Sequence, residues 1–517
     1  MNLLKYSEAK DTDIINLLGE KIDLSKRILI GRTTVYSIHP RIYDVKPLDN
    51  TLPNFNIKFK SKKTGNLIVA FKLKNSFLNT SKNKLQKPEG MIIDVIGIEE
   101  ELNLTDILIR HFNLKPKKKR IKPCLNNKQV DRLDLTRLNT ISIDPSESTK
   151  DIDDAISIEY HLSNKTLLTI GVHIANPTDF LDKKTILDRA DTMVESLYPF
   201  NKKTVNLWGD KITELSSLKE NEKKPCLSLL IKISEHVDKY QIKDISLKPS
   251  WISNKKNLSY ESSKNNQLTK ELMNITRNLD NNKTEIKDTH ELIAYWMIFY
   301  NHYIGTKFKD ILPHRVHNVT ISESFDNLND HVKTVFRNRS MESAYYSLDE
   351  FNHDSMNKVN MTHASSPIRR LFDTCIHWYV LYQENLFTPS LINQINSIKK
   401  NINKFNNQNK ILEWIDKLNN SKIFKLIIYQ IKDNYCEGYN EITGFLKFEI
   451  IPKKLQVLYS KTIIEKDNNI EQIIYIKDDH KINLKIGEEI EIIVKKKKGF
   501  LPTEKFVVTP NYSFNFL

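Results

Sequence analysis

Apolar and polar residues alternate along the first part of the chain in short runs typical of β-strands. These runs are residues 27–38, 55–60, 66–73 and 90–98, and polar, turn-rich spacers separate them. Residues 105–114 follow with apolar positions at helical spacing. The pattern predicts a small antiparallel barrel or sandwich that ends in a short helix.

The middle of the chain, residues 135–385, begins with strand-like runs and continues into helical ones. The strand-like runs are residues 139–144, 155–160, 166–176 and 226–233, and the longest helical run is residues 290–308. The succession predicts one large domain of mixed α and β structure.

The last part of the chain changes character twice. An Asn-rich stretch at residues 391–422 has a helical pattern, and strand-like runs return after it. Those runs are residues 442–451, 454–460, 471–476 and 486–495. We therefore expect an α+β protein with a mixed central domain between two small β-barrels.

The expected boundaries follow from these changes of pattern. They are an N-terminal extension (1–26), a first barrel (27–114), a basic linker (115–134), the central domain (135–390), a helical connection (391–424) and a C-terminal barrel (425–517).

The composition of the chain gives it a positive net charge. The chain has 517 residues with 79 Lys and Arg against 64 Asp and Glu, so its formal charge is +15. Such a surplus indicates a polyanionic partner, either nucleic acid or an anionic membrane surface. The 12 glycines are few for this length, while Lys, Asn and Ile are abundant, so coding bias explains part of the surplus.

The densest basic run is residues 115–122. It suits a solvated linker, a nuclear import signal or a strip that contacts phosphates, and the sequence leaves these open.

The cysteines and the apolar runs bear on the compartment. The four cysteines have no paired spacing, so neither a disulfide framework nor a zinc ribbon is indicated. No window approaches 18 consecutive apolar residues. We expect an intracellular, soluble protein without a membrane partner, in the cytoplasm, with a nuclear or organellar location left open.

Four carboxylates stand close together between two predicted strands: Asp144, Asp151, Asp153 and Asp154. Carboxylates at this density repel one another unless cations or arginines neutralise them. Hard oxygen ligands suit Mg²⁺ or Mn²⁺, and a pair of such ions can direct attack on a phosphodiester. Two alternatives to a metal site are open. The aspartates could form an acidic turn on the surface, or they could supply the general acid of a terpene cyclase.

A second cluster lies about two hundred residues later, where Ser366 is followed by Arg369 and Arg370. Guanidinium groups bind phosphate oxygens in pairs and stay charged at any relevant pH. The pair can therefore hold a phosphate beside the acidic loop, or it can act as a structural salt-bridge centre.

Together these segments resemble the RNB family, the catalytic domain of ribonuclease II, ribonuclease R and the exosome's catalytic subunit. The shared motifs are Ile-Asp-Pro at 143–145, Asp-x-Asp-Asp-Ala at 151–155, Gly-Val-His-Ile-Ala at 171–175 and Ser-Pro-Ile-Arg-Arg at 366–370. The resemblance spans residues 90–385, and it implies an RNB-type catalytic domain flanked by OB-like, RNA-binding barrels, the first of them of the cold-shock type.

The resemblance implies a 3′-to-5′ exoribonuclease that hydrolyses single-stranded RNA to nucleoside 5′-monophosphates. In that reading Asp144, Asp151 and Asp154 hold a Mg²⁺ ion, for which Mn²⁺ could substitute. Asp153 would position a second metal and its water, and Arg369 would grip the scissile phosphate.

The resemblance also implies residues that bind the RNA strand. Tyr198 would stack on a base near the 3′ end, and Tyr260 would touch the 3′ nucleotide or serve only in packing. Ser366 and Arg370 would join Arg369 in binding the RNA, and a monomer is expected.

The sequence departs from the family pattern at several positions. Asp144 and Asp151 are seven residues apart instead of six, which predicts a bulge in the loop. Tyr295 stands where the family has a ribose-reading Glu, and Asn409 replaces a second Glu. A glycine-rich family turn is replaced by residues 353–358.

Three histidines, His173, His317 and His377, are interpreted as hydrogen-bonded scaffold residues, because two-metal hydrolysis needs no imidazole base. The competing functional hypothesis is a non-catalytic RNA-binding protein on the same scaffold. A terpene cyclase would be all-α, which the β-rich ends of the chain argue against.

Overall fold

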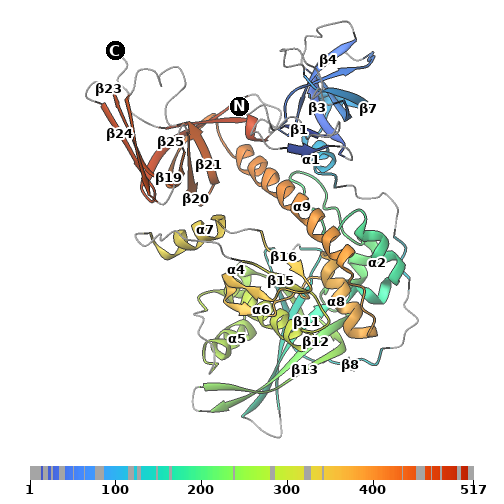
Figure 1. Ribbon diagram of the computed structural model, residues 1–517. Coiled ribbons are helices and arrows are strands. Elements are labelled where there is room, and N and C mark those ends of the chain that lie inside the picture. The colour runs from blue at the N-terminus through green and yellow to red at the C-terminus, as the bar shows by residue number, and fades with distance from the viewer. Residues whose placement is uncertain are drawn as a thin grey trace. The chain divides into compact units, whose positions relative to one another are not determined.

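The computed structural model contains a seven-stranded sheet, of which β8, β11, β12 and β13 are labelled in Figure 1. The structure describes residues 13–15, 21–24, 27–33, 41–49, 52–62, 65–75, 87–114, 121–124, 130–146, 149–161, 166–236, 239–279, 286–318, 328–340, 343–432, 435–449, 460–466, 469–477, 480–497 and 502–510. The chain divides into two compact units, Met1–Leu114 with Lys404–Leu517 and Lys115–Asn403, and each is described by itself.

The strand order in the central sheet is β14-β9-β10-β11-β12-β13-β8. The strands are β8 (Leu133–Asp134), β9 (Thr140–Asp144), β10 (Asp154–Tyr160), β11 (Leu167–Ala175), β12 (Lys223–His236), β13 (Lys239–Ser253) and β14 (Lys256–Ser259). Neighbours are antiparallel except at the two edges, where β14 joins β9 and β8 joins β13 in parallel. The strands predicted at 139–144, 155–160, 166–176 and 226–233 are confirmed.

Strand β11 lies in the middle of the sheet and is buried along nearly its whole length. Its sequence is an almost continuous apolar run, which is typical of a strand that is covered on both faces. Thr169 and His173 are its polar residues, and the two ring nitrogens of His173 are hydrogen-bonded to Ser157 Oγ at 2.9 Å and Ser228 Oγ at 2.7 Å. The prediction that His173 is a scaffold histidine is confirmed.

Helix α6 (Thr289–Lys307) packs on the sheet and confirms the helix predicted at 290–308. It is apolar on most sides, as expected of a helix buried in a large domain. Its tyrosines also contact the sheet backbone, because the Tyr300 hydroxyl donates to Leu227 O on β12 and the Tyr303 hydroxyl donates to Ile245 O on β13.

Further helices, turns and strands belong to the central unit. They are the 3-10 turn Pro177–Phe180, α2 (Lys183–Ala190), α3 (Gly209–Ser216), α4 (Tyr260–Ser263), α5 (Gln267–Arg277), β15 (His314–Val316), α7 (Asp330–Ser340), β16 (Tyr345–Ser347), β17 (Asn352–His353), the 3-10 turn Asp354–Met356, β18 (Lys358–Val359), α8 (Leu371–Tyr382) and α9 (Pro389–Asp416). Helix α9 continues into the other unit and lies in the region where a helical connection was expected.

The segment that replaces the family's glycine-rich turn uses asparagines where the backbone is left-handed. Asn357 has φ +48° and Asn360 has φ +57°. Asparagine tolerates this conformation better than most residues with a side chain. The chain therefore turns between β17 and β18 without glycine.

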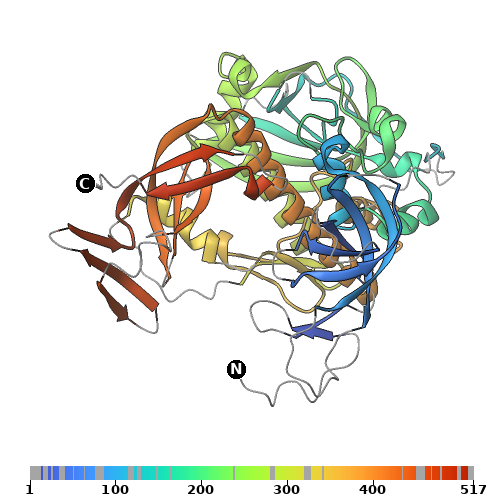
Figure 2. The same cartoon turned by 90° about the horizontal axis from the view of Figure 1, so that it is seen from above.

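The N-terminal part contains a closed barrel with the strand order β3-β4-β5-β7-β6, drawn in blue in Figure 2. Its strands are β3 (Leu29–Thr33), β4 (Ile42–Pro47), β5 (Phe55–Lys58), β6 (Leu67–Asn75) and β7 (Glu89–Ile98). The hairpin of β1 (Asp13–Ile15) and β2 (Lys21–Asp23) precedes it, and a 3-10 turn (Glu99–Glu101) and α1 (Leu104–His111) follow it. The sequence pattern did not single out β4.

The barrel encloses its own apolar core. Val45, Phe55, Ile57 and Phe71 are fully buried within it. Helix α1 begins at Asn103, whose side chain accepts a hydrogen bond from the backbone N–H of Thr105 at 3.0 Å. The prediction of a barrel or sandwich with a short exit helix is confirmed as a barrel, but β5 and β7 pair in parallel and not in antiparallel orientation.

The C-terminal part contains two sheets, ordered β21-β20-β19-β25-β26 and β22-β23-β24. The strands are β19 (Ser421–Ile431), β20 (Tyr435–Asn440), β21 (Gly444–Glu449), β22 (Ser460–Lys466), β23 (Asn469–Lys477), β24 (His480–Lys485), β25 (Glu489–Lys496) and β26 (Phe506–Pro510), and a 3-10 turn (Pro502–Glu504) precedes β26. The edge strands β21 and β26 contact each other, so the first sheet curls toward a barrel. The run predicted at 454–460 lies outside the described residues except at Ser460.

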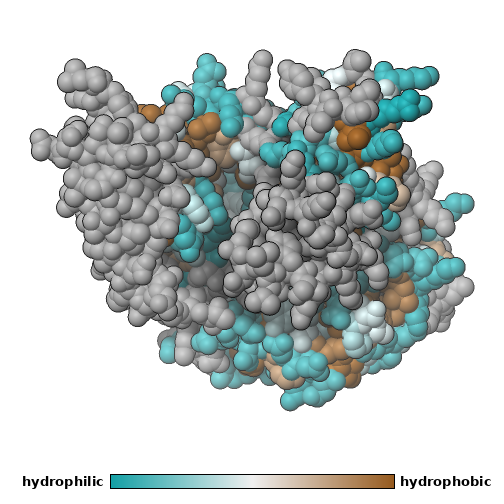
Figure 3. Space-filling model, turned by 45° about the horizontal axis from the view of Figure 1, so that its top comes forward, coloured by the Kyte–Doolittle hydropathy of each residue, from teal (hydrophilic) through white to brown (hydrophobic). Residues whose placement is uncertain are grey.

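Polar residues cover most of the described surface on the face in Figure 3, where apolar residues form small separate patches. Among the helices of the described residues, none is long and apolar enough to cross a membrane. The basic run at 115–122 lies outside the described residues except for its last two positions.

Gly305 of α6 gives a test of this packing. A Cβ built there would lie 1.9 Å from the backbone oxygen of Asn360. Because a backbone atom cannot move aside as a flexible side chain can, we expect Gly305→Ala to lower the free energy of unfolding by roughly 2–3 kcal/mol. Urea denaturation followed by circular dichroism measures the change.

The control for this experiment is Thr306→Ala, because Thr306 is the next residue on α6 and is exposed. It should leave the denaturation midpoint almost unchanged. Equal midpoints for Gly305→Ala and the wild type would contradict the close approach of α6 to Asn360.

Candidate metal and phosphate site

The acidic loop joins two neighbouring strands at one end of the central sheet. Asp144 is the last residue of β9 and Asp154 is the first residue of β10, and these strands pair in antiparallel orientation. Asp151 and Asp153 lie in the loop between them. The strand pairing therefore brings the ends of the loop together and gathers the four carboxylates at one place.

Backbone hydrogen bonds fix the second half of this loop. The N–H of Ile152 donates to Ser217 Oγ at 3.0 Å, and the N–H of Ala175 donates to Asp153 O at 2.8 Å. Between Asp144 and Asp151, the N–H of Thr149 donates to Ser146 O at 3.0 Å. Residues 147 and 148 lie outside the described residues, and the bulge predicted for this loop stays a prediction.

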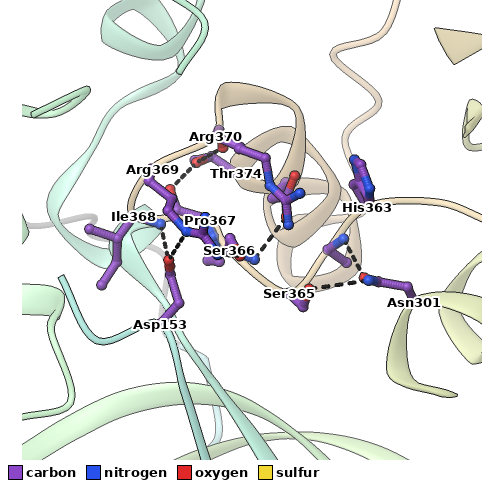
Figure 4. Close-up of polar contacts among 12 residues, drawn as sticks. Asp153, Asn301, His363, Ser365, Ser366, Pro367, Ile368, Arg369, Arg370 and Thr374 are labelled. Carbon is purple, nitrogen blue, oxygen red and sulfur yellow. Dashed lines mark hydrogen bonds and ion pairs between the residues drawn. The ribbon is translucent and has the colours of Figure 1, made fainter. Parts of the chain in front are cut away.

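The Ser-Pro-Ile-Arg-Arg segment forms a tight turn just before α8. Asp373, fully buried on the first turn of α8, accepts a hydrogen bond from the N–H of Ser366 at 2.8 Å and pairs with Arg370 at 2.9 Å. Trp208 Nε1 donates to Pro367 O at 3.0 Å. These contacts hold the backbone of the turn in place, and Figure 4 shows the turn from Ser365 to Arg370.

The turn and the acidic loop meet at Asp153. The N–H of Ile368 donates to Asp153 Oδ1 at 2.9 Å, and Arg369 Nε donates to Asp153 Oδ2 at 3.0 Å. The Arg369 Nη2 donates to Ser366 Oγ at 2.9 Å. Figure 4 shows the three groups side by side, although Asp153 and Arg369 are 216 residues apart in the sequence.

Burial and like charges act on the carboxylates. Burial, followed by the charges of Asp154, Asp153 and Asp151, raises the pKa of Asp144 to about 8. Burial raises the pKa of Asp153 to about 7 although Arg369 opposes this, and it raises the pKa of Asp154 to about 6 against Arg369 and Arg370. Burial therefore disfavours the charged form of all three carboxyls, and at Asp153 and Asp154 the neighbouring arginines oppose it only in part.

The pKa of Arg369 also departs from its ordinary value, in the direction that favours the charged form. Burial is the largest single influence and would lower the pKa of the guanidinium. The charge of and hydrogen bond to Asp153, together with the charges of Tyr198 and Asp154, raise that pKa above its ordinary value. Its side chain is still 46% exposed. Arg369 therefore combines a fixed contact to Asp153 with a guanidinium surface that solvent, or a phosphate, can reach.

The donor chemistry fits a hard divalent cation. Among the described residues, no group of three or more His, Cys, Asp or Glu side chains is arranged so that it could hold a metal ion. The four carboxylates nevertheless lie on one loop, and carboxylate oxygens are the ligands that Mg²⁺ and Mn²⁺ prefer. A bound cation would favour the ionised form of Asp144 and Asp154, which burial disfavours. Asp144 and Asp154 are the better candidates for ligands, because both oxygens of Asp153 already accept hydrogen bonds.

Two tyrosines border the carboxylates. The hydroxyl of Tyr198 donates to Asp151 Oδ2, and the Tyr198 side chain remains 47% exposed. Tyr260 follows Ser259, which pairs with Asp144 across β14 and β9. Burial, followed by the charges of Asp154 and Asp144, raises the pKa of Tyr260. The structure thus places next to the acidic loop both tyrosines that were expected to contact RNA.

The adjacent arginines point in different directions. Arg369 contacts Asp153, whereas Arg370 pairs with Asp373 inside the domain. Ser366 is also buried, and its hydroxyl accepts a hydrogen bond from Arg369. The geometry gives Arg370 and Ser366 contacts that shape the turn, while Arg369 faces the carboxylates.

The remaining residues singled out in the sequence make contacts of their own. Buried His377 is hydrogen-bonded to Ala364 O at 2.8 Å, and His317 is bonded to Ser355 Oγ at 2.7 Å, so their prediction as scaffold histidines is confirmed. Tyr295 is half-buried on α6 and contacts Trp296 and Phe299. Asn409 is on α9 and belongs to the other unit.

The sequence pattern missed two supporting residues. Ser217 Oγ accepts a hydrogen bond from the N–H of Ile152. Asn301 on α6 accepts a hydrogen bond from the N–H of Ala364 at 2.8 Å and donates one to Ser365 Oγ at 3.1 Å. A buried Asn in an apolar helix is a usable signal for such a role, because it needs hydrogen-bond partners. Nothing in the sequence indicates which partners it finds.

Comparison with known proteins agrees with this architecture. The RNB domain model matches residues 132–271 and 263–383. Exoribonuclease 2 of Yersinia enterocolitica is 33% identical over 144 residues, which is 27% of this chain and 21% of the relative. Exoribonuclease 2 of Yersinia pestis is 32% identical over 157 residues, or 30% of this chain and 23% of the relative. The matches thus span about a fifth to a quarter of the curated relatives.

Solved structures share the fold over most of the chain. RNase R of Mycoplasma genitalium, in complex with ribose-methylated single-stranded RNA, aligns with a TM-score of 0.66 at 17% identity, over 95% of this chain and 90% of that one. Yeast Ssd1, described as a pseudonuclease, aligns with a TM-score of 0.69 at 14% identity, over 94% and 83%.

The fold and the domain match define an α+β protein with a central RNB domain and β-barrel-like sheets toward its ends. The chain belongs to the RNB family.

The raised carboxyl pKa values predict how metal binding depends on pH. A carboxyl whose folded pKa is raised keeps its proton after the unfolded chain has lost its own, so without a cation this stability contribution falls as pH rises from about 4 to 8. A bound cation favours the ionised form, so we expect the Mg²⁺-induced rise in melting temperature to grow between pH 6 and pH 9. At ten times Kd the stabilisation is about 1.4 kcal/mol.

Thermal denaturation with and without Mg²⁺ at each pH measures this effect. Asp144→Asn should remove most of it, whereas Asp210→Asn, a matched change at an exposed carboxylate paired with Lys203, should not. An equal Mg²⁺ effect at pH 6 and pH 9 would contradict the predicted linkage.

Proposed function

We propose that this chain is a divalent-metal-dependent 3′-to-5′ exoribonuclease that hydrolyses single-stranded RNA and releases nucleoside 5′-monophosphates. The observation that carries the proposal is the contact between Asp153 and Arg369, which joins the acidic loop to an exposed guanidinium. A phosphodiester can then lie between a carboxylate cluster and a fixed positive charge.

Each charged side chain has a role in this proposal. Asp144, Asp151 and Asp154 would hold Mg²⁺, or Mn²⁺ in its place, and Asp153 would orient the attacking water with a second ion. When bound, the metal supplies a more acidic water and neutralises phosphate charge. Arg369 would bind the scissile phosphate and stabilise the charge that develops on it during attack.

Tyr198 and Tyr260 are proposed to contact the bases near the 3′ end. The half-exposed ring of Tyr198 offers a face to a base, and aromatic stacking tolerates any base, which suits a degradative enzyme. The net charge of +15 supports a polyanionic substrate. We also assign RNA binding to the terminal barrels, because the resemblance to the RNB family implies it.

The names of related proteins support this proposal. Two curated relatives are named Exoribonuclease 2. The Dss1 protein of Candida glabrata, which shares the fold with a TM-score of 0.58 at 14% identity, is named an exoribonuclease.

A non-catalytic RNA-binding protein is the second candidate, because the fold also matches Ssd1, a pseudonuclease. The residues of this chain favour catalysis. All four aspartates are present in the acidic loop, and Arg369 stands beside them. A binding protein would not need carboxylates that repel the phosphates of its own ligand.

Incubation of 5′-end-labelled single-stranded RNA with Mg²⁺ tests the activity. The wild type should shorten the RNA from its 3′ end, and thin-layer chromatography of uniformly labelled RNA should show nucleoside 5′-monophosphates. Asp153→Asn should lower the rate by about a hundredfold or more, because it removes a charged group that acts on the reacting water.

Asp210→Asn is the matched control here too and should keep the wild-type rate. RNA binding by Asp153→Asn, measured by fluorescence anisotropy, should persist. A wild-type protein that binds RNA but never shortens it with Mg²⁺ or Mn²⁺ would favour the binding protein over the enzyme.

The presence of Tyr295 in place of a glutamate predicts that the protein discriminates only weakly between RNA and DNA. A carboxylate at this position would accept a hydrogen bond from the 2′-OH, whereas the half-buried Tyr295 packs against Phe299. We therefore expect a higher ratio of RNA to DNA degradation rates for Tyr295→Glu than for the wild type, with strands of matched sequence. Equal ratios would show that position 295 does not read the sugar.

A further inference from the structure

Tyr198 joins two parts of the proposed site with one side chain. Its hydroxyl donates a hydrogen bond to Asp151 Oδ2, while 47% of its surface is exposed. A phenol can use its ring face and its hydroxyl at the same time, because the two point in different directions. Tyr198 can therefore contact a base and a carboxylate together.

The fold fixes the segment that carries Tyr198. Leu197 and Val205 exchange both backbone hydrogen bonds, at 3.0 Å and 2.9 Å. The N–H of Ser196 donates to Arg369 O at 2.9 Å, and the N–H of Leu207 donates to Ser196 Oγ at 2.9 Å. The position of the Tyr198 hydroxyl is therefore set by a closed loop that is bonded to the backbone of Arg369.

The carboxylate of Asp151 depends on this contact more than its neighbours in the acidic loop do. Asp153 is held through both carboxylate oxygens by Ile368 and Arg369, and Ile152 is held through its N–H by Ser217. Asp151 receives its hydrogen bond from Tyr198, which stands on a different segment of the chain. A change at Tyr198 therefore changes the orientation of a proposed metal ligand.

We propose that Tyr198 is a positioning residue that couples RNA binding to metal binding by orienting Asp151 through its hydroxyl while its ring stacks on a base. The proposal rests on the proposed function. A base stacked on the ring restricts the side chain, and the restricted hydroxyl holds one oxygen of Asp151 while leaving the other for the cation. By linkage, a cation at Asp151 then strengthens RNA binding by the same factor as RNA strengthens cation binding.

Two substitutions separate the hydroxyl from the ring. Tyr198→Phe keeps the ring and removes the hydroxyl, and Tyr198→Leu removes both. Isothermal titration with Mn²⁺ in the absence of RNA should show an affinity about tenfold or more weaker for both variants, as for the loss of other residues that orient metal ligands. RNA binding in EDTA should be unchanged in Tyr198→Phe and weakened about fivefold or more in Tyr198→Leu.

The coupling is measured by RNA affinity with and without Mn²⁺. An Asp153→Asn background prevents hydrolysis during this measurement. Mn²⁺ should strengthen RNA binding when Tyr198 is present and should have a much smaller effect with Tyr198→Phe. These measurements need no turnover.

Tyr160→Phe is a matched control, because the Tyr160 hydroxyl also donates to a carboxylate, that of Glu271, and its side chain is similarly exposed at 48%. It lies at the other end of β10 from Asp154 and should leave the Mn²⁺ affinity unchanged. Melting temperatures of all variants report whether they fold.

Three results would overturn the proposal: wild-type Mn²⁺ affinity in Tyr198→Phe, equal weakening by Tyr160→Phe, or no Mn²⁺ binding by the wild type. Failure of the proposed function has a different signature, because RNA would then go uncleaved while Tyr198→Phe still weakened Mn²⁺ binding.

Discussion

The buried carboxylate of Asp153 is the interaction on which the site depends. The side chain is only 3% exposed, and a buried charge is costly unless it is paired and hydrogen-bonded. Ile368 and Arg369 supply both kinds of contact from a turn 215 and 216 residues away. The acidic loop and this turn must therefore come together for either to be stable. The same contact places a guanidinium beside the carboxylates, so one constraint serves both folding and chemistry.

Further charged side chains surround the contact between Asp153 and Arg369. Asp373 neutralises Arg370 within the domain, so Arg370 can be buried and can support the turn that presents Arg369. Burial raises the pKa of Asp144 and Asp154, and at Asp144 the charges of the neighbouring aspartates raise it further. A chain of net charge +15 thus contains a centre of opposite sign. That arrangement suits a polyanion that must approach a cation-binding site.

Much of the fold was predictable from local patterns. Continuous apolar runs predicted the central strands, and the apolar run at 290–308 predicted helix α6, because burial on both faces or on most sides leaves a local signature. The first barrel was predicted without β4, whose sequence mixes polar and apolar residues. The four aspartates were found because they are adjacent in sequence. The sequence suggested that the arginine pair could hold a phosphate beside the acidic loop, but it did not predict the contact of Arg369 with Asp153.

The sequence by itself determined the elements, the acidic loop and the two arginines, because those features depend on residue type and on near neighbours. Only the tertiary structure decided that Arg369 faces Asp153 while Arg370 turns to Asp373, and that the hydroxyl of Tyr198 reaches Asp151. It also decided that Asn301 holds the segment before the turn. These pairings join residues on different segments. Which buried polar group finds which partner depends on how whole strands and helices pack, and no local pattern encodes that.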